Sequence, residues 1–191
     1  DSADIKGVSG EGGSAGAALD ATHLTLASGA SVTMTAAQHE SFSGTVAGSG
    51  SETITLSTSG TVTARSAVES YVLAASGGSN ITLSAAAQNV TTGASGADTI
   101  TVGGLTATGT FNTVAADVIS LATGANIASV NAEGSGAGTV LDANNLTLAS
   151  GASVTMTLAQ HDGFSGTVTA GGSETINLTT AGTVAALADI E

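Results

Sequence analysis

Short stretches in which apolar and polar residues alternate recur along the whole chain, and Gly, Ser or Asn commonly separates them. Clear examples occupy 32–35, 53–56, 61–64 and 99–102. A period of two directs one set of side chains to the inner face of a strand and the Thr or Ser set to the outer face. The pattern therefore predicts an all-β chain built from many short strands.

A long internal duplication dominates the sequence. Residues 5–64 align without a gap on residues 127–186, an offset of 122, and 40 of the 60 aligned positions are identical. The segment between the two copies, 65–126, is divergent but contains weaker echoes of the same pattern at 71–83 and 119–127. Short units that repeat in this way stack on their neighbours and bury a continuous core. The duplication therefore predicts a parallel β-solenoid.

The intervals between the echoes predict the length of one coil. Five coils of about 24 residues fill the offset of 122, and residues 1–191 are expected to form a single solenoid domain. Three strands per coil would give a parallel β-helix. Two strands per coil would give a flattened β-roll, with the Ala-rich stretches 36–39 and 84–87 as loops or single helical turns. The spacing of the strands leaves both architectures open.

The two ends of the sequence fall inside the repeat pattern. The chain begins just before one copy, and Glu191 aligns with Glu69, so a further copy of residue 70 onward would follow next. An uncapped solenoid end is an exposed strand edge that templates association. We therefore expect either a slice of a longer array or a unit whose open ends stack on further copies.

Composition and charge exclude several classes of partner. Two cations stand against fifteen carboxylates, which gives a formal net charge of −13 and no basic surface to neutralise nucleic acid or an anionic membrane. No run of apolar residues reaches the roughly 18 residues of a membrane helix, so membrane insertion is not expected. Cysteine is absent and aromatic residues make up only 2% of the chain, so slim aliphatic side chains must build the core.

One glycine-rich segment carries a recognisable pattern. Residues 93–101, Gly-Ala-Ser-Gly-Ala-Asp-Thr-Ile-Thr, follow the nonapeptide G-G-x-G-x-D-x-U-x except at the second position, and degenerate versions at 48–54 and 171–176 have Glu in place of Asp. The segment resembles the calcium-binding nonapeptide repeats of type I-secreted bacterial surface proteins, adhesins and S-layer proteins. That resemblance implies calcium as a cofactor, held by an Asp and by backbone carbonyls of the glycine-rich turns. The implied ligand positions are Asp98, Gly93, Gly96, Glu52 and Glu174.

The composition of the whole chain extends this resemblance. Abundant Thr, Ala, Gly, Ser and Val, few cations and no Cys or Pro are similar to the β-solenoid portion of Gram-negative S-layer proteins and large adhesins. The resemblance implies an extracellular location at the cell surface. The expected function is that of a structural repeat segment of a surface layer, filament or adhesin, with further copies of itself as the main partner and a cell-surface glycan as a second predicted partner.

Two His–acid pairs are candidates for catalysis or metal binding. His39 with Glu40 and His161 with Asp162 both lie in the repeated motif A-Q-H-[ED]-x-F. Metal or acid–base chemistry needs at least three converging groups, and no third partner stands near either pair in the sequence. We therefore interpret both pairs as structural, and we expect the protein not to be an enzyme.

Pairs of threonines in the pattern Thr-x-Thr suggest an alternative function. A ladder of such pairs on a flat solenoid face is the device of ice-binding proteins, so an ice-binding or carbohydrate-binding module is the alternative reading. Yet the spacing between the pairs is irregular, and Thr is favoured on any solvated strand face. The pairs are Thr33/Thr35, Thr53/Thr55, Thr61/Thr63, Thr99/Thr101, Thr155/Thr157 and Thr167/Thr169.

Overall fold

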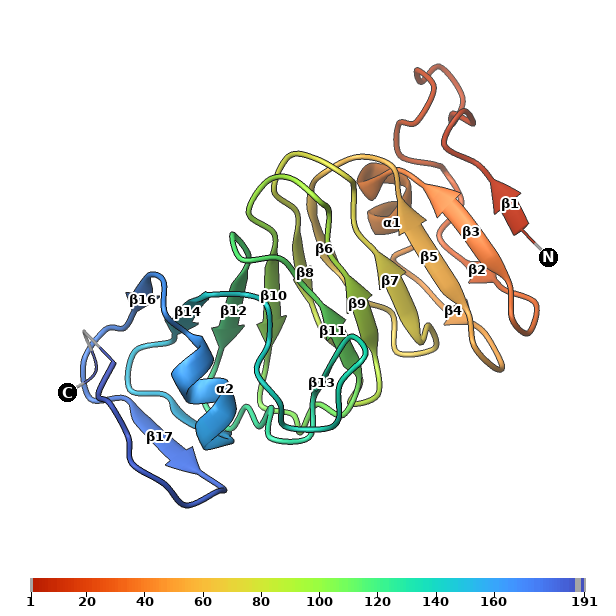
Figure 1. The fold of residues 1–191 in the computed structure, drawn as a ribbon. Helices are drawn as coiled ribbons and strands as arrows, with labels where there is room; N and C mark the ends of the chain where they lie inside the picture. The colour runs from red at the N-terminus through yellow and green to blue at the C-terminus, as the bar shows by residue number, and fades with distance from the viewer. Residues whose placement is uncertain (1, 188–189, 191) are drawn as a thin grey trace.

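Parallel strands stack along one axis into an elongated rod, with the two ends of the chain at opposite ends of the rod (Figure 1). The structure is a computed structural model and describes residues 2–187 and 190. The chain is nearly all-β, and its coils lie roughly 21 residues apart in about seven turns. The predicted parallel β-solenoid is therefore confirmed.

The longest ladder forms the first side of the coil. Seven strands pair in parallel along it, each with its equivalent in the next coil. These strands are β1 (Ser2–Asp4), β3 (Ser31–Met34), β5 (Thr53–Leu56), β7 (Ser70–Val72), β9 (Asn89–Thr91), β11 (Thr110–Asn112) and β13 (Asn131–Ala132).

The second side is a ladder of six strands that alternate along the chain with those of the first side. From β5 to β13 the two ladders share their coils, so that each turn there contributes one strand to both. The strands are β6 (Thr61–Thr63), β8 (Asn80–Thr82), β10 (Thr99–Val102), β12 (Val118–Leu121), β14 (Asn145–Leu148) and β16 (Val168–Thr169).

The third side is paired more sparsely. Near the N-terminus it contains β2 (Leu24–Thr25) and β4 (Val46–Ala47), and near the C-terminus it contains β15 (Ser153–Met156) and β17 (Thr175–Leu178). Between these pairs, single bridges from Thr106 to Asn126 and from Asn126 to Thr155 continue the ladder. The coil therefore has three sides, as in a parallel β-helix, and the sparse pairing of the third explains why strand spacing alone left the β-roll open.

Two short helices replace strands at equivalent places in the duplicated segments. Helix α1 (Ala36–Ser41) follows β3 and contacts β6, and α2 (Leu158–Gly163) follows β15. Each helix begins with a capping box formed by a Thr and a Gln three residues later. The Thr side chain accepts from the backbone N–H of the Gln, and the Gln side chain accepts from the backbone N–H of the Thr. The sequence Thr-x-x-Gln after a strand therefore determines where both helices begin.

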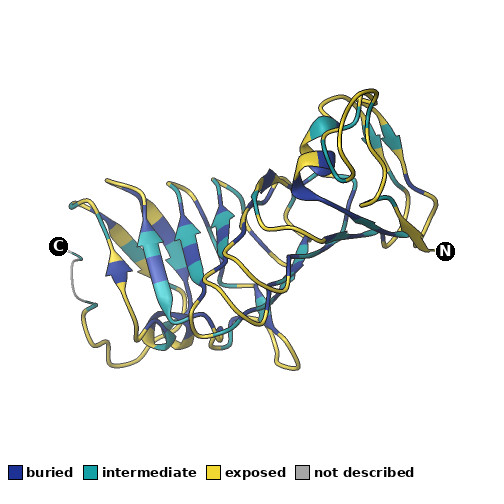
Figure 2. Ribbon diagram, turned by 90° about the horizontal axis from the view of Figure 1, so that it is seen from above, coloured by how far each residue is buried: buried dark blue, intermediate teal, exposed yellow. Residues whose placement is uncertain are grey.

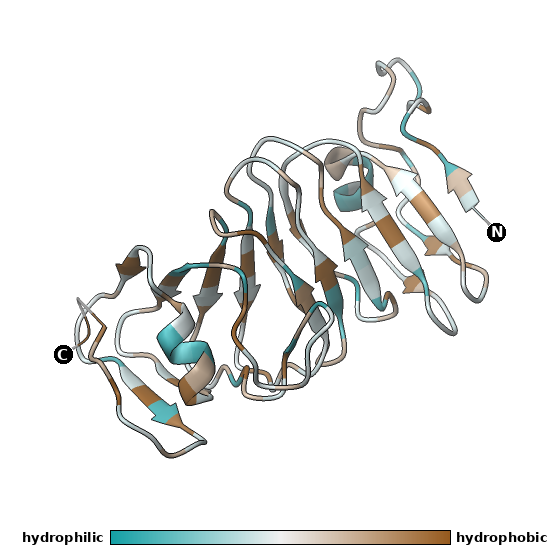
Figure 3. Cartoon of the chain, viewed as in Figure 1, coloured by the Kyte–Doolittle hydropathy of each residue, from teal (hydrophilic) through white to brown (hydrophobic). Residues whose placement is uncertain are grey.

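Aliphatic ladders fill the interior of the rod. Along the first side the inward residues stack in register, and along the second side a row of Val, Ile and Leu does the same. In Figure 3 brown apolar bands cross many of the strands, and in Figure 2 parts of the strands are buried while much of the connecting loops is exposed. The first row is Val32, Ile54, Tyr71, Val90, Phe111 and Ala132, and the second is Val62, Ile81, Ile100, Ile119, Leu146 and Val168.

Close stacking also explains a glycine at one corner. The backbone of Gly109 passes so near the previous coil that a Cβ atom there would collide with the carbonyl oxygen of Gln88. Strands in neighbouring coils lie about 4.8 Å apart, so a corner that turns directly over another leaves no space for a side chain.

The observed coils, roughly 21 residues apart, are somewhat shorter than the predicted length of about 24 residues, and the reason lies in the duplication. Strand β3 is on the first side, whereas its duplicate β15 is on the third side. The offset of 122 residues therefore spans five coils and two further sides of the sixth, which gives coils of roughly 21 residues. The second copy is rotated by one side of the coil relative to the first, which the sequence alignment cannot reveal.

Candidate functional site: buried carboxylates at the coil corners

The residues of the predicted calcium turn meet at the corner that leads into β10. Asp98 directly precedes this strand and is only 1% exposed. Its Oδ2 atom accepts from the backbone N–H of Gly93 in its own turn (2.7 Å), and its Oδ1 atom accepts from Ser79 N–H in the previous coil (2.5 Å). Gly96 has a φ of +101° and lies against the backbone of Gly77 and Gly78, where a side chain would not fit.

A second carboxylate continues this arrangement one coil further on. Asp117 directly precedes β12 and is fully buried. Its Oδ1 atom accepts from Asp98 N–H (2.9 Å), while its Oδ2 atom accepts from Val114 N–H (2.8 Å) and from the Thr92 hydroxyl (2.6 Å). Sequence reasoning missed Asp117 because its turn contains no glycine. The usable signal was an Asp directly before a predicted strand, 19 residues after Asp98.

The two predicted glutamates occupy equivalent corners of the duplicated segments. Glu52 Oε1 accepts from Ser49 N–H (3.1 Å) and Gly29 N–H (3.3 Å). Glu174 Oε1 accepts from the residues at the same repeat positions, Gly171 and Gly151, at 2.9 and 3.1 Å. Both side chains are almost fully buried, and neither Oε2 atom has a hydrogen-bond partner within the described part of the chain. The duplication has therefore preserved a complete hydrogen-bonded corner.

The electrostatics of these corners favour ionised carboxylates. Burial alone would raise the pKa of Glu52, but the neighbouring Glu69 side chain and hydrogen bonds from backbone N–H groups such as those of Ser49 and Gly29 outweigh it, so that the pKa lies below its ordinary value. The same balance of burial against backbone hydrogen bonds lowers the pKa of Glu174. Glu69 takes part a second time, because its Oε2 atom accepts from the backbone N–H of Glu52 at 2.9 Å.

These contacts suit carboxylates that hold backbone amides better than they suit calcium. Calcium needs six to eight oxygen ligands, whereas the groups that face Asp98 are N–H donors. Among residues 2–187 and 190, no three His, Asp or Glu side chains converge in a way that could hold a metal ion. Among the predicted ligand residues, the Oε2 atoms of Glu52 and Glu174 are buried carboxylate oxygens without a hydrogen-bond partner in the described part of the chain. Calcium binding at the predicted residues stays a prediction.

The His–acid pairs lie on the two helices and join histidine to its neighbour in sequence. His39 Nδ1 is 2.9 Å from Glu40 Oε1, and His161 Nδ1 is 2.9 Å from Asp162 Oδ1. The other ring nitrogen of His39, Nε2, lies 3.3 Å from the hydroxyl of Tyr71, and the two rings meet edge to face with centroids 5.6 Å apart. The first pair is thus part of a buried contact between a helix and the next coil.

Burial shifts both partners of this contact towards their neutral forms. It lowers the pKa of His39, although the carboxylate of Glu40 acts in the opposite direction. It raises the pKa of Tyr71 to about 12, although the backbone N–H of Arg65 donates to the phenol oxygen at 2.7 Å. A neutral imidazole beside a neutral phenol explains how two polar groups share an apolar interior.

The alkaline titration of the protein tests this environment. Tyr71 is the one tyrosine of the chain and tryptophan is absent, so absorbance at 295 nm reports this phenol alone. We expect its midpoint near pH 12 in the folded protein and near pH 10 in urea. Because the unfolded phenol loses its proton first, stability is fully present below about pH 10 and falls by about 3 kcal/mol as the pH rises to 12. A folded midpoint near pH 10 would contradict the buried contact.

The threonine pairs are divided among the sides of the coil. Thr53/Thr55 belongs to β5 on the first side, whereas Thr61/Thr63 and Thr99/Thr101 belong to β6 and β10 on the second. Between those last two strands the equivalent outward positions in β8 are Asn80 and Thr82. The pairs therefore do not stack in consecutive coils.

Comparison with known proteins adds no relative from which a function could be transferred. The sequence matches no family model, and no match is found among curated proteins or solved structures. Within the described residues, no helix is long and apolar enough to span a membrane. The functional argument therefore rests on the geometry of the chain itself.

Proposed function

We propose that this chain is a structural, non-catalytic repeat segment of an extracellular bacterial surface layer, filament or adhesin, and that it acts by self-association. The observation that carries the proposal is the way in which equivalent strand edges are paired in the two copies. At each end of the rod one strand edge has no partner among the described residues, and the equivalent edge inside the same molecule is paired with a further coil.

The C-terminal end provides the clearer case. Within the described residues, β17 pairs only with β15, in the register in which β5 pairs with β3. The other edge of β5 pairs with β7, so that Ile54 stacks on Tyr71. The equivalent edge of β17 is open and has nearly the same sequence, Thr-Ile-Asn-Leu in place of Thr-Ile-Thr-Leu. It is therefore suited to receive a parallel strand.

The N-terminal end also has a strand, β1, with one edge unpaired among the described residues. Strand β1 pairs with β3 on one edge, and no described residue pairs with its other edge. The segment equivalent to β1 in the second copy, 124–126, directly precedes the duplicated residues, and its Asn126 is paired on that second edge with Thr106 of the previous coil. Beside β1, a cavity of about 220 Å³ opens between apolar side chains that include Ala3, Leu26 and Val32. Both ends of the rod thus expose apolar surface next to an open strand edge.

The charge of the chain agrees with an exported array. A net charge of −13 keeps separate rods soluble through mutual repulsion until neighbours or cations reduce it. Calcium bridging of the acidic corners, predicted from the nonapeptide pattern, would act at this step. An ice-binding or carbohydrate-binding role is the alternative, which thermal-hysteresis and glycan-binding assays test directly.

Two neighbouring substitutions on β17 test the proposed association. The Ile176 side chain points into the open end of the rod, whereas the Thr175 side chain is exposed on the outer face. Ile176→Asp places a charge where a stacking coil would bury it, and we expect association in sedimentation velocity to weaken at least tenfold. Thr175→Asp adds the same charge to the same strand and should leave association unchanged. Equal behaviour of both variants and the unmodified chain would contradict coil stacking at this end.

A further inference from the structure

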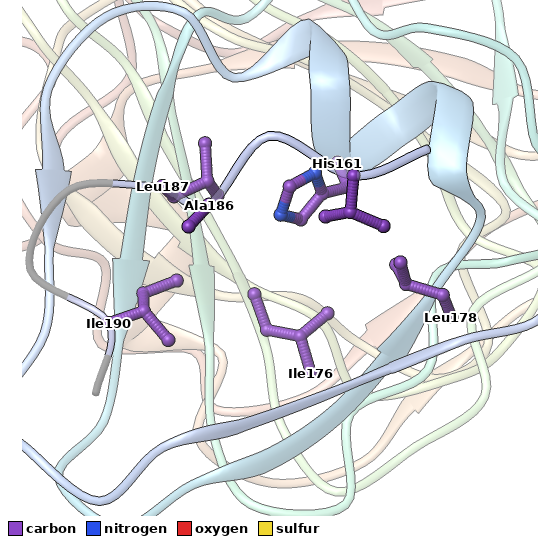
Figure 4. Close-up of a pocket in the computed structure, with 7 residues that line it drawn as sticks. His161, Ile176, Leu178, Ala186, Leu187 and Ile190 are labelled. Carbon is purple, nitrogen blue, oxygen red and sulfur yellow. The ribbon is translucent and has the colours of Figure 1, made fainter. Parts of the chain in front are cut away.

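The C-terminal end of the rod contains a cavity of about 170 Å³ with mostly apolar walls. Ile176 and Leu178 of β17 form one wall, and Leu187 and Ile190 from the last part of the chain form another. Figure 4 shows the imidazole of His161 pointing into the space between them. A polar ring at one end of an apolar pocket is an arrangement that fixes the orientation of a ligand.

In the first copy, the position equivalent to this pocket is occupied by a side chain. Subtracting the offset of 122, continued past residue 186 to the last lining residues, converts the seven lining residues into residues of the first copy. Three of these, His39, Ile54 and Arg65, contact Tyr71. His161 becomes His39, whose Nε2 atom lies 3.3 Å from the Tyr71 hydroxyl, and Leu187 becomes Arg65, whose backbone N–H donates to that hydroxyl at 2.7 Å. The pocket is therefore the duplicated seat of a tyrosine side chain.

The second copy keeps the polar groups of this seat. His161 Nδ1 is held by Asp162 as His39 Nδ1 is held by Glu40, so Nε2 is again the nitrogen left for a ligand. Across residues 2–187 and 190, no group hydrogen-bonds His161 Nε2 or accepts from the backbone N–H of Leu187. The apolar walls are correspondingly exposed, since Val184 is 46% exposed and its duplicate Val62 is 1% exposed.

We propose that this pocket receives the tyrosine side chain of a strand that adds in parallel to the open edge of β17. The tyrosine lies opposite Ile176, as Tyr71 lies opposite Ile54. Its hydroxyl accepts from Leu187 N–H and contacts His161 Nε2. The partner is therefore a further solenoid coil with the sequence type Ser-Tyr-Val. This inference deepens the proposed function, on which it rests, by naming the strand that the C-terminal end selects.

Other strands, such as β1 of another copy in end-to-end association, can pair with the edge of β17 but fill the pocket less well. Strand β1 of another copy would offer Ala3 at the inward position, since Ala3 is the residue that stacks on Val32. An alanine leaves most of the cavity of about 170 Å³ unfilled. A phenylalanine fills it but leaves the N–H of Leu187 without an acceptor in a dry site, which costs more than the hydrogen bond alone contributes. Size and hydrogen bonding together select tyrosine.

A peptide with the sequence of residues 65–75, which contains the Ser-Tyr-Val strand, is the direct probe. We expect it to bind the full chain saturably and to shift the NMR signals of the His161 imidazole but not those of His39. A Tyr→Phe peptide should bind about tenfold more weakly, and a Tyr→Ala peptide should not bind measurably. In the protein, His161→Leu should reduce the preference for Tyr over Phe to the part that the N–H of Leu187 supplies, whereas the remote control His23→Leu should retain the full preference.

A chain extended after Glu191 by a second copy of residues 70–126 provides a measurement that needs no free peptide. The extension adds one tyrosine, and we expect it to titrate near pH 12, as is expected of Tyr71. An added tyrosine that titrates near pH 10, or a peptide affinity that ignores the change from Tyr to Phe or Ala, overturns the proposal. So does free phenol binding as tightly as the peptide, because the strand then contributes nothing. Where the isolated strand binds too weakly to measure, the extended chain decides.

Failure of this inference is distinguishable from failure of the proposed function. Both experiments are carried out at concentrations at which the chain is monomeric, so they report the pocket and not the assembly. A chain that forms rods while its pocket ignores tyrosine loses this inference only. A chain that binds the peptide but never associates loses the self-association.

Discussion

Replacement of Tyr71 by alanine is expected to lower the free energy of unfolding by about 3–5 kcal/mol. The side chain is fully buried, and it stacks between Ile54 and Val90 in the ladder of the first side. Aromatic residues are only 2% of the chain, so few neighbours are large enough to move into the cavity that the substitution leaves. Urea denaturation followed by circular dichroism measures the loss.

A conservative substitution at the same position separates volume from hydrogen bonding. Tyr71→Phe keeps the ring but removes the oxygen that accepts from Arg65 N–H and contacts His39. Its expected cost is about 1–2 kcal/mol, the penalty for a buried donor without an acceptor. A loss below about 1 kcal/mol for Tyr71→Ala would show that the coil does not depend on this side chain.

Asp117→Asn should destabilise the protein by a similar amount, about 3 kcal/mol or more. The carboxylate accepts three hydrogen bonds, two from backbone N–H groups and one from the Thr92 hydroxyl. An asparagine has one acceptor oxygen, and its amide N–H₂ group would face donors. Whichever way the amide turns, the substitution therefore leaves one backbone N–H group unpaired, that of Asp98 or that of Val114.

An exposed aspartate provides the matched control for this substitution. Asp142→Asn makes the same chemical change and the same change in net charge at a solvent-exposed position, and its effect should stay within about 0.5 kcal/mol. Equal effects of the two substitutions would contradict the role assigned to Asp117. The same comparison in calcium and in chelator shows whether the metal stabilises these corners.

The solenoid could be predicted from the sequence because apolar and polar residues alternate regularly in its strands. Alternation such as Thr-Ile-Thr-Leu at 53–56 specifies an inner and an outer face, and the repeat specifies that coils stack. The coil length could not be obtained in the same way. A repeat need not contain whole coils, and only pairing reveals that β15 is on a different side from β3.

The candidate site was predicted in part. Asp98, Glu52 and Glu174 were identified from their glycine-rich turns, and the structure places all three at buried corners before a strand. Their hydrogen-bond partners in the preceding coil lie 19 to 23 residues away, a distance at which no local pattern operates. The contact between His39 and Tyr71 was also missed, because the two residues are 32 positions apart in the sequence. Tyr71 lies outside the duplicated segment as well, so the repeat did not point to it.

The most direct test of the proposed function is electron microscopy of the purified chain over a range of concentrations, in calcium and in chelator. The account predicts rods of the width of one solenoid that lengthen as concentration rises, because the ends of each molecule receive further coils. Rods in both solutions fit carboxylates that hold backbone amides, and rods that dissolve in chelator would assign calcium to the acidic corners. Particles of single-molecule length at every concentration would contradict the central claim that this chain works by stacking its ends.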